Sequence, residues 1–327
     1  MDKHIRNKKV LVTGGAGFIG SNLVEALLSQ GNEVVCFDNF ATGKHSNIES
    51  FLINERFILV EGDIRNPDDC RRAVKNAEIV LHQAALGSVP RSVKDPVTTN
   101  SVNIDGFLNM LVAARDAGVK RFVYASSSSV YGDHPGLPKV EEETGNLLSP
   151  YAVTKKVNEL YAGVFAGLYG MEVIGLRYFN VFGKRQDPDG QYAAVIPRFI
   201  KSLIAHQSPE IYGDGQQSRD FTFVENVVHA NQAAALAPAE ALGKSYNIAF
   251  GERITLTELF YLLRENLSQF DPAIGHIEPL FVGERPGDIK HSLASIDKAR
   301  MLMGYDPQVS VREGLKRAID WYWENLR

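Results

Sequence analysis

The chain of 327 residues is 44% hydrophobic and 23% charged, and its formal net charge is −4. This length exceeds the usual size of a single domain, so we expect two lobes or one large α/β domain with an appendage. The charge balance leaves no broad basic face, which argues against a nucleic-acid partner. The first apolar run, Val10–Val12, is too short for a signal peptide or a membrane span, so we expect a cytoplasmic protein without membrane contact.

Cysteine and histidine usage indicates neither a disulfide framework nor a metal site. The two cysteines, Cys36 and Cys70, are too few for such a framework, and Cys36 lies in an apolar run typical of a core. The eight histidines are scattered without the spacing of metal ligands.

The chain alternates between strand and helix patterns up to residue 180. Short apolar runs predict strands at 9–13, 33–38, 57–63, 78–83, 121–125 and 172–177. Apolar residues at helical spacing predict helices at 21–28, 68–76, 96–117 and 149–170. This alternation is typical of an α/β fold and predicts a doubly wound, parallel sheet of the Rossmann type.

The alternation ends after Asn180. A segment rich in Gly, Pro, Asp and Gln at 183–192 precedes a predicted helix at 193–205, and the run 245–249 predicts a strand that returns to the sheet. From Thr255 onward the pattern is mostly helical. We therefore predict two parts with a cleft between them. They are a Rossmann-type domain at 1–180, rejoined by 224–250, and a smaller, discontinuous mixed α/β substrate lobe at 181–223 and 251–327.

A glycine-rich loop follows the first predicted strand. Its glycines fit two registers, Gly-x-Gly-x-x-Gly at 15–20 and Gly-x-x-Gly-x-x-Gly at 14–20. Either register allows a tight turn and close approach of the backbone to a pyrophosphate at the start of the next helix. Asp38 ends the second strand, 18 residues after Gly20, where a carboxylate accepts bonds from ribose hydroxyls and repels a 2′-phosphate. The context predicts a dinucleotide site that prefers NAD to NADP.

Two further strand ends are expected at the same edge of the sheet. Asp63 closes the third strand, and Gln83-Ala84-Ala85 follows the fourth, so an adenine and a nicotinamide ribose could lie there. Asp63 fits an ordinary turn position equally well.

Tyr151 and Lys155 lie four residues apart on a predicted helix and therefore share one face. Ser149 fits the N-cap of this helix, and Pro150 fits its first position. A free tyrosine titrates at about 10, so a base that works near neutral pH needs roughly 4 kcal/mol of extra stabilisation of the phenolate. An exposed lysine supplies only about 0–1 kcal/mol. The pair alone is common on solvated helices, and a catalytic role requires partial burial and a second cation.

A run of four serines, Ser126–Ser129, ends the fifth predicted strand. Ligands bind at the carboxyl ends of parallel strands, so we expect this run above the start of the Tyr151 helix. Alone, the serines would fit a polar, capped strand end. Beside Tyr151, Lys155 and a nicotinamide, they supply the groups needed to move a hydride and a proton at a carbinol carbon.

Four motifs together resemble the extended short-chain dehydrogenase/reductase family and, within it, the nucleotide-sugar 4-epimerases. They are Thr13-Gly14-Gly15-Ala16-Gly17-Phe18-Ile19-Gly20, Ser127-Ser128-Ser129-Val130-Tyr131-Gly132, Tyr151-x-x-x-Lys155 and Leu176-Arg177-Tyr178-Phe179-Asn180. The similarity extends over essentially the whole chain, including the segment 283–288.

The resemblance implies a mechanism that uses NAD as cofactor. Tyr151 would take the proton of the sugar O4, directly or through Ser127, while C4 gives a hydride to NAD. Lys155 would hold the nicotinamide ribose and, together with the cationic nicotinamide, lower the pKa of Tyr151. The 4-keto sugar would present its other face and take the hydride back, so that NAD is regenerated in each turnover.

The resemblance also implies two sets of binding residues. The cofactor set is Gly14, Gly17, Phe18, Ile19, Asp38, Asn39, Gly43, Asp63, Ile64, Gln83, Ala84, Ala85, Tyr151, Lys155 and Tyr178. The substrate set is Ser88, Arg91, Ser127, Ser128, Ser129, Asn180, Ala194, Val195, Tyr212, Arg219, Arg285, Asp288 and Ser292.

Within the substrate set, Arg219 and Arg285 are expected to bind the pyrophosphate through forked donors. Asp288 would hold the uridine ribose, and Tyr212 would lie near the uracil. Without the resemblance, either arginine fits a salt bridge equally well.

The strand-end serines separate this chain from neighbouring branches of the family. The related 4,6-dehydratases have Thr-Asp-Glu at Ser127–Ser129, so the acid and base for eliminating water are missing here. UDP-glucuronate decarboxylases usually carry a glutamate in this segment, which is also absent. A net oxidoreductase or decarboxylase, which would release NADH, and a cofactor-binding regulator without catalysis remain alternatives. The presence of Tyr151, Lys155 and Ser127 argues against the regulator.

Ser292 aligns with a position where epimerases restricted to non-acetylated sugars carry a bulky tyrosine. A small residue leaves room for a 2-acetamido group, so the resemblance implies a 4-epimerase of UDP-N-acetylglucosamine and UDP-N-acetylgalactosamine that supplies surface polysaccharide precursors. Epimerases of UDP-glucose and UDP-galactose, or of the corresponding acetamido uronic acids, are the alternatives.

Members of this family often dimerise through helices corresponding to 97–117 and 150–168, so we expect a homodimer. Val102, Leu108 and Leu111 on the first helix could lie in that interface or in the core of the subunit.

Overall fold

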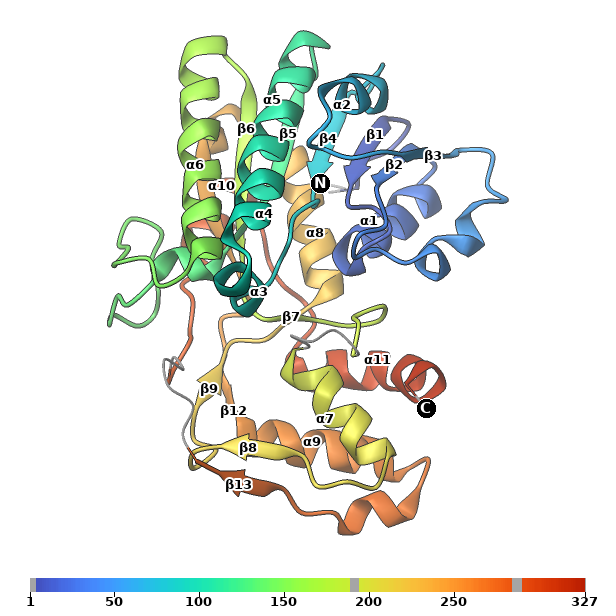
Figure 1. The fold of residues 1–327 in the computed structure, drawn as a ribbon, viewed down its shortest axis with the longest axis vertical. Helices are drawn as coiled ribbons and strands as arrows, with labels where there is room; N and C mark the ends of the chain where they lie inside the picture. Colours follow the sequence, from blue (N-terminus) through green and yellow to red (C-terminus); the bar gives the residue numbers. More distant parts are fainter. Residues whose placement is uncertain (1–3, 189–193, 284–289, 327) are drawn as a thin grey trace.

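A parallel sheet of seven strands organises the larger part of the structure (Figure 1). The computed structural model describes residues 4–188, 194–283 and 290–326. In spatial order the strands are β11 (Lys244–Ile248), β6 (Glu172–Tyr178), β5 (Arg121–Ser127), β4 (Ile79–His82), β1 (Lys9–Thr13), β2 (Glu33–Asp38) and β3 (Phe57–Glu61). Every neighbouring pair runs parallel. The chain builds outward from β1 in both directions, so a crevice forms at the carboxyl ends of β1 and β4.

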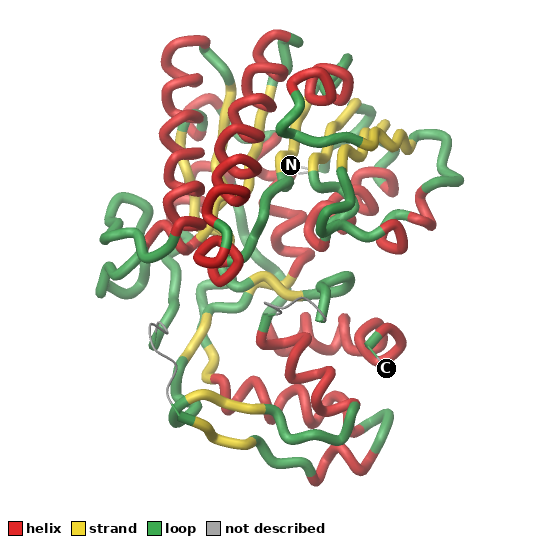
Figure 2. Tube along the Cα trace, viewed as in Figure 1, coloured by secondary structure: helices red, strands yellow, loops and turns green. Residues whose placement is uncertain are grey.

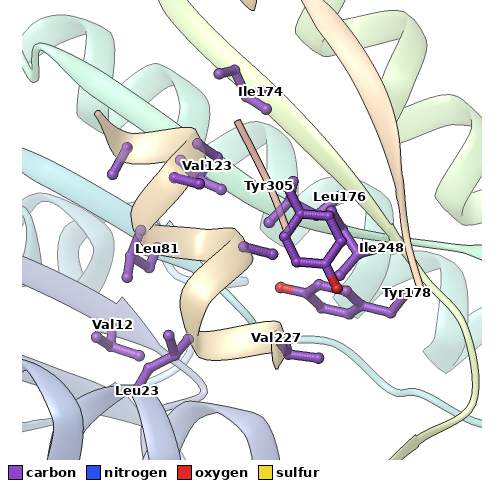
Figure 3. Packing of buried hydrophobic residues seen from close by; sticks show 14 of the residues in the cluster. Val12, Leu23, Leu81, Val123, Ile174, Leu176, Tyr178, Val227, Ile248 and Tyr305 are labelled. Carbon is purple, nitrogen blue, oxygen red and sulfur yellow. The ribbon is translucent and has the colours of Figure 1, made fainter. Parts of the chain in front are cut away.

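Helices cover both faces of this sheet (Figures 1 and 2). One face carries α1 (Phe18–Ser29), α8 (Val224–Ala235) and α10 (Asp297–Met303), and the other carries α2 (Pro67–Ala73), α5 (Gly106–Asp116) and α6 (Pro150–Tyr169). Strand residues alternate between the faces, because Val10 and Val12 cluster with α1 and α8 whereas Leu11 clusters with α2 and α5. Figure 3 shows Leu81 and Val227 among the side chains gathered around α8. The predicted doubly wound α/β fold is confirmed.

Helix α6 begins and ends where its sequence predicts. The Ser149 side chain accepts a hydrogen bond from the Ala152 amide at 3.1 Å, and Pro150 occupies the first turn, where no N–H is needed. Gly170 ends the helix with a left-handed backbone at φ +64°. These local signals determine where Tyr151 and Lys155 lie relative to the sheet.

The predicted helix at 96–117 has a different structure. It consists of α4 (Pro96–Asn100), a π-helical turn at Ser101–Asp105 and α5, and a short α3 (Val89–Lys94) precedes it. In the π-turn, the Asn103 side chain accepts from the Leu86 amide at 2.8 Å and donates to the hydroxyl of Thr154 at 3.1 Å. The spacing of apolar residues does not encode these contacts, which tie the loop after β4 to α6.

A smaller lobe lies below the carboxyl edge of the sheet (Figure 1). Its helices are α7 (Val195–Ile204), α9 (Leu256–Ser268) and α11 (Val311–Asn325). Its strands pair as β7 (Val181–Phe182) with β10 (Thr222–Phe223), β8 (Glu210–Tyr212) with β13 (Leu280–Val282), and β9 (Ser218–Arg219) with β12 (Ile254–Thr255). Phe199, Phe260 and Leu315 belong to its separate hydrophobic core. The mixed α/β character agrees with the predicted second lobe.

Short 3₁₀ turns complete the described chain. They are η1 (His45–Asn47), η2 (Glu49–Phe51), η4 (Ser128–Tyr131), η5 (Ala239–Ala241) and η6 (Pro272–His276). None of the described helices is long and apolar enough to cross a membrane.

The chain passes repeatedly between the sheet and the smaller lobe. Helix α8 packs on the sheet and leads to β11, which pairs with β6. The segment after residue 290 also returns, since Ala299 and Met303 of α10 pack in the core of the sheet. The exact boundaries of the two parts stay a prediction.

Candidate active site

A cavity of about 650 Å³ lies along the carboxyl ends of β1, β2, β4 and β5. The predicted site residues that line it are Gly14, Gly17, Phe18, Ile19, Asp38, Asn39, Asp63, Ile64, Gln83, Ala84, Ala85, Ser127, Ser128, Tyr151, Lys155, Tyr178 and Asn180. The cavity therefore brings together the glycine loop, the second-strand carboxylate, the strand-end serines and the Tyr–Lys pair.

The glycine loop approaches β4 so closely that side chains are excluded. Gly14 has φ +66°, and a Cβ placed on it would lie 2.8 Å from the Ala84 nitrogen. A Cβ on Gly20 would overlap the Gly14 carbonyl. Helix α1 starts directly after Gly17 without a side-chain cap, so its first N–H groups point toward the cavity wall. This geometry fits a pyrophosphate at the start of the helix.

Asp38 is held firmly at the tip of β2. Its carboxylate accepts bonds from the amides of Ala16 and Phe40, both at 2.9 Å. Burial raises its pKa, and these bonds oppose the rise. Gly43, expected among the cofactor residues, lies outside the wall, and a Cβ on it would lie 3.0 Å from both Ala16 and the Asp38 carboxylate. A carboxylate at this place fits the ribose of NAD and disfavours a 2′-phosphate.

Asp63 occupies a turn position, which is one of the two expectations for it, and it also lines the cavity. Strand β3 ends at Glu61, earlier than predicted, and Asp63 then makes a turn in which its carboxylate accepts from the Arg65 amide at 2.8 Å. The Arg65 guanidinium pairs with the same carboxylate at 2.6 Å, and this bond lowers the pKa of Asp63 to about 2. Both Asp63 and Arg65 also line the cavity.

Lys155 is almost fully buried, with 2% of its surface exposed. Its ammonium donates to the Ala125 carbonyl at 2.8 Å and lies 5.9 Å from the centre of the Tyr151 ring. Burial lowers the pKa of Lys155 to about 8. Burial also raises the pKa of Tyr151, and a hydrogen bond with Ser127 only partly opposes the rise. The protein groups alone therefore favour the neutral phenol, and a further cation is needed to make Tyr151 a base.

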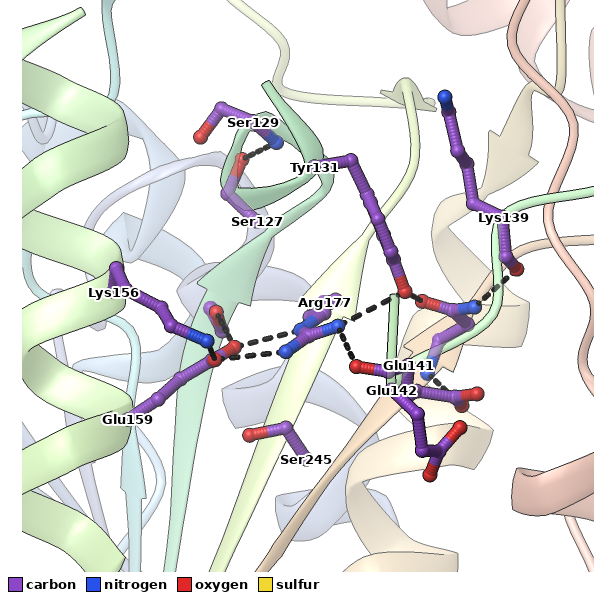
Figure 4. A network of polar contacts seen from close by, with 12 residues as sticks. Ser127, Ser129, Tyr131, Lys139, Glu141, Glu142, Lys156, Glu159, Arg177 and Ser245 are labelled. Carbon is purple, nitrogen blue, oxygen red and sulfur yellow. Dashed lines mark hydrogen bonds and ion pairs between the residues drawn. The ribbon is translucent and has the colours of Figure 1, made fainter. Parts of the chain in front are cut away.

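The strand-end serines differ in their surroundings. Ser127 and Ser128 line the cavity, and the Ser127 hydroxyl accepts from the Ser129 amide at 3.1 Å (Figure 4). Ser129 lies outside the cavity wall, and its buried hydroxyl has no hydrogen-bond partner in the described structure. Ser127 is therefore the serine placed between the sheet and Tyr151.

Next to the cavity, three side chains form a closed set of hydrogen bonds. Tyr178 donates to Gln83 at 3.0 Å and accepts from Asn231 at 2.9 Å, and Gln83 donates to Asn231 at 3.1 Å. Burial raises the pKa of Tyr178, so it remains a neutral phenol. These bonds fix the ends of β4 and β6 relative to each other.

The remaining substrate candidates among the described residues lie outside the cavity wall. Ser88 caps α3 by accepting from the amide of Arg91 at 3.2 Å. Ala194 and Val195 lie at the start of α7, and Tyr212 lies in β8.

Arg219 lies in β9, and the segment that contains Ser292 is hydrogen-bonded to this strand. Arg219 donates to the carbonyls of Ser218 and Lys290, both at 3.1 Å, and the Ser292 amide donates to the Ser218 carbonyl at 3.0 Å. Arg285 and Asp288 fall outside the described residues.

Several cavity residues were not predicted from the sequence. They include Ala41, Thr42, Arg65, Leu86, Thr98, Val102 and Val181. Thr98 and Val102 come from α4 and the π-turn, which an amphipathic pattern alone assigns to the core. Position after a strand end could have indicated Leu86 and Val181. Among the described residues, no cluster of His, Cys, Asp or Glu could hold a metal ion.

Behind the serines, a buried ion pair joins α6 to the sheet (Figure 4). Glu159 accepts from Arg177 at 2.7 Å and from the Ser126 hydroxyl at 2.7 Å. Burial opposes ionisation of Glu159, but the bonds with Arg177 outweigh it and lower the pKa of the carboxyl. Arg177 also donates to the Tyr131 hydroxyl at 3.0 Å. The network thus links the strand end next to Ser127 with the helix that carries Lys155.

The sequence matches the model of the NAD dependent epimerase/dehydratase family over residues 10–249. The chain belongs to this family. It is 38% identical over 320 residues to a putative UDP-glucose 4-epimerase of Methanocaldococcus jannaschii, which covers 97% of this chain and 99% of that protein. The resemblance drawn from the four motifs is confirmed.

Solved structures of two members are similar over nearly their whole length. The UDP-N-acetylglucosamine 4-epimerase from Methanobrevibacter ruminantium, in complex with UDP-N-acetylmuramic acid, has a TM-score of 0.90 and 38% identity over 98% of this chain and 99% of that one. The UDP-glucose 4-epimerase of Thermotoga maritima, with UDP-glucose, has a TM-score of 0.89 and 35% identity over 98% and 100%. The protein is an NAD-dependent nucleotide-sugar 4-epimerase.

The buried ion pair leads to a prediction about stability. Glu159→Gln leaves the Arg177 charge buried without a counter-charge, and we expect it to lower the free energy of unfolding by about 3–5 kcal/mol. As a control, Glu78→Gln removes an exposed partner of Lys8 and should cost about 0–1 kcal/mol. Urea unfolding followed by circular dichroism measures both values. Similar losses in the two variants would show that the buried pair does not anchor α6.

Proposed function

We propose that this epimerase interconverts UDP-N-acetylglucosamine and UDP-N-acetylgalactosamine. The observation that carries the proposal is the small side chain of Ser292 next to β9, the strand that bears Arg219. A tyrosine at this position would occupy the space of a 2-acetamido group, whereas a serine leaves it open. The likeness to the M. ruminantium enzyme supports the same substrate class.

The proposed reaction is an oxidation and reduction at the same carbon. NAD, which the glycine loop and Asp38 would hold, would supply the acceptor and then the donor of the hydride at sugar C4. Tyr151 takes the proton of the O4 hydroxyl as the C4–H bond breaks, and a carbon–oxygen double bond forms at C4. In the return step Tyr151 gives the proton back to O4, so no proton or electron pair is lost.

The cavity residues have distinct roles in this scheme. Ser127, which is hydrogen-bonded to Tyr151, orients the phenol toward O4 or relays the O4 proton to it. Lys155 donates to the Ala125 carbonyl and retains N–H groups for the nicotinamide ribose. The cationic nicotinamide then supplies the second cation that lowers the pKa of Tyr151. Asn180 lies in the cavity wall, where we expect it to contact the sugar.

Three substrate alternatives use the same scaffold. UDP-glucose with UDP-galactose is the first, since the T. maritima structure contains UDP-glucose. The second is the corresponding UDP-acetamido uronic acids, and the third is decarboxylation of UDP-glucuronate, which the absence of a strand-end glutamate disfavours. We further propose a cytoplasmic location and a role in supplying surface polysaccharide precursors.

We also propose a homodimer, formed through α6 and the adjoining helices. On α6, Leu160, Val164 and Leu168 are 60%, 51% and 72% exposed. They lie at helical spacing and form one apolar stripe. Leu111, which the sequence offered as an interface residue, is fully buried in the core of the subunit. The exposed stripe on α6 therefore supports the interface better than α5 does.

Substrate choice can be tested with a single pair of proteins. We expect the wild-type enzyme to convert UDP-N-acetylglucosamine to UDP-N-acetylgalactosamine in an assay followed by proton NMR. Ser292→Tyr fills the proposed acetamido space and should lower kcat/KM for UDP-N-acetylglucosamine about tenfold or more, with UDP-glucose little affected. If the wild type converts only UDP-glucose, the proposed substrate is wrong. An unchanged preference in the variant would place the determinant elsewhere.

The base can be tested by removing one oxygen atom. Tyr151→Phe keeps the ring but loses the proton acceptor, so we expect kcat to fall by about 10²- to 10⁴-fold. NAD should still bind, because the glycine loop and Asp38 are unchanged. Activity measured by NMR, with bound NAD measured after denaturation, separates the two effects. A variant that retains most of its activity would exclude Tyr151 as the base.

The dimer is tested by placing a charge in the apolar stripe. Leu160→Asp should yield monomers in size-exclusion chromatography with light scattering, because a buried carboxylate opposes association. Ile53→Asp is the control, since Ile53 is 91% exposed but lies far from α6 in sequence and outside the stripe. A dimer that persists in Leu160→Asp, or a wild-type monomer, would contradict this interface.

A further inference from the structure

Asp220 is a carboxylate that the catalytic scheme does not use. It lies between β9 and β10 and has no exposed surface. Burial, together with the nearby charge of Glu252, raises its pKa to about 7, although hydrogen bonds from backbone amides oppose the rise. Among the described residues, no Lys or Arg side chain forms an ion pair with it. Burying a carboxylate without a counter-charge costs free energy of folding unless hydrogen bonds compensate for the lost water.

Three backbone amides from two separate segments converge on this carboxylate. Oδ1 accepts from Phe250 at 3.1 Å, and both oxygens accept from Gly251 at 3.2–3.3 Å. Oδ2 accepts from Ala294 at 3.2 Å. A carboxylate has acceptors only, so it can satisfy all three N–H groups at once, whereas an asparagine would turn its own N–H groups toward at least one of them.

One of the two segments that meet at Asp220 carries a substrate candidate, and two more candidates adjoin Asp220 itself. Arg219 directly precedes Asp220 in the chain. The backbone carbonyl of Asp220 accepts a hydrogen bond from the Asn180 side chain at 2.9 Å. Asn180 has φ +33°, a strained backbone for a residue other than glycine. Ala294 is two residues from Ser292, whose amide is bonded to β9. Asp220 is thus linked to three proposed substrate positions. It follows Arg219 in the chain, it is bonded to Asn180, and it is bonded to Ala294, two residues from Ser292.

We propose that Asp220 is a positioning residue that sets the width of the sugar pocket by holding the Ser292 segment at a fixed distance from Arg219 and Asn180. This inference rests on the proposed substrate site, because it concerns the residues assigned to the sugar and pyrophosphate. The Ser292 segment is also bonded to Ser218 and to Lys139. Loss of the Ala294 bond therefore loosens it without detaching it, while the cavity at the other strand ends keeps its own contacts.

Asp220→Asn is the direct test, because it keeps the volume and breaks at least one anchor. We expect KM for UDP-N-acetylglucosamine to rise about tenfold, as for the loss of one hydrogen bond to a charged group. The ratio of kcat/KM between UDP-N-acetylglucosamine and UDP-glucose should change, with kcat and NAD content nearly unchanged. Amide hydrogen exchange in residues 290–295 should be several-fold faster, with or without UDP.

Asn226→Ala is the matched control in the same part of the molecule. Asn226 is also buried and ties the backbone of Gln308 and Val309, but it does not contact the substrate segments. It should lower the melting temperature without changing the KM, the sugar preference or the exchange at 290–295.

A second variant covers the case in which Asp220→Asn fails to fold. Ala294→Pro removes a single N–H donor, leaves the carboxylate in place, and should shift the KM and the exchange in the same direction. Unchanged exchange and sugar preference in the folded variant, or an equal shift in Asn226→Ala, would overturn the proposal. A wild-type enzyme inactive on UDP-N-acetylglucosamine would instead refute the substrate, and the exchange data would still decide the role of Asp220.

Discussion

The burial of Tyr151 and Lys155 is the constraint on which the site depends. Burial raises the pKa of the phenol and lowers that of the ammonium to about 8, so both shifts favour uncharged groups. A buried phenolate is stable only when a cation lies beside it. The site is thereby prepared to respond to NAD in its oxidised, cationic form. In the proposed scheme that charge would disappear on hydride transfer, and Tyr151 would then keep its proton more readily. Burial would thus couple proton transfer to hydride transfer.

Such coupling requires fixed geometry, and the surrounding contacts supply it from three directions. The ion pair of Glu159 and Arg177 holds α6 against the ends of β5 and β6. The Asn103 side chain fixes the loop after β4 to the same helix. Asp220 joins the segments at Phe250 and Ala294 to the end of β9. Each is a buried polar contact. Leaving a buried polar group without its hydrogen-bond partner costs free energy, so these contacts favour a single arrangement of the segments they join.

The sequence predicted those parts of the site that depend on short-range signals. The glycine loop, Asp38 and the capped helix of Tyr151 each lie within one element or at its end, where spacing and turn chemistry are sufficient. The π-turn around Asn103 and the amides that meet at Asp220 could not be predicted, because they join segments that are far apart in the chain. For the same reason, Leu111 could not be assigned to the core before the packing of α5 was known.

Isotope transfer tests the central claim, a reversible hydride transfer within one active site, most directly. UDP-N-acetylglucosamine carrying deuterium at C4 would be mixed with unlabelled substrate and epimerised, and the products examined by mass spectrometry and NMR. We expect the deuterium to remain at C4 of the same molecule after inversion, with no exchange into unlabelled sugar and no steady accumulation of NADH. Loss of deuterium to solvent, its appearance in the unlabelled pool, or stoichiometric NADH would contradict this mechanism.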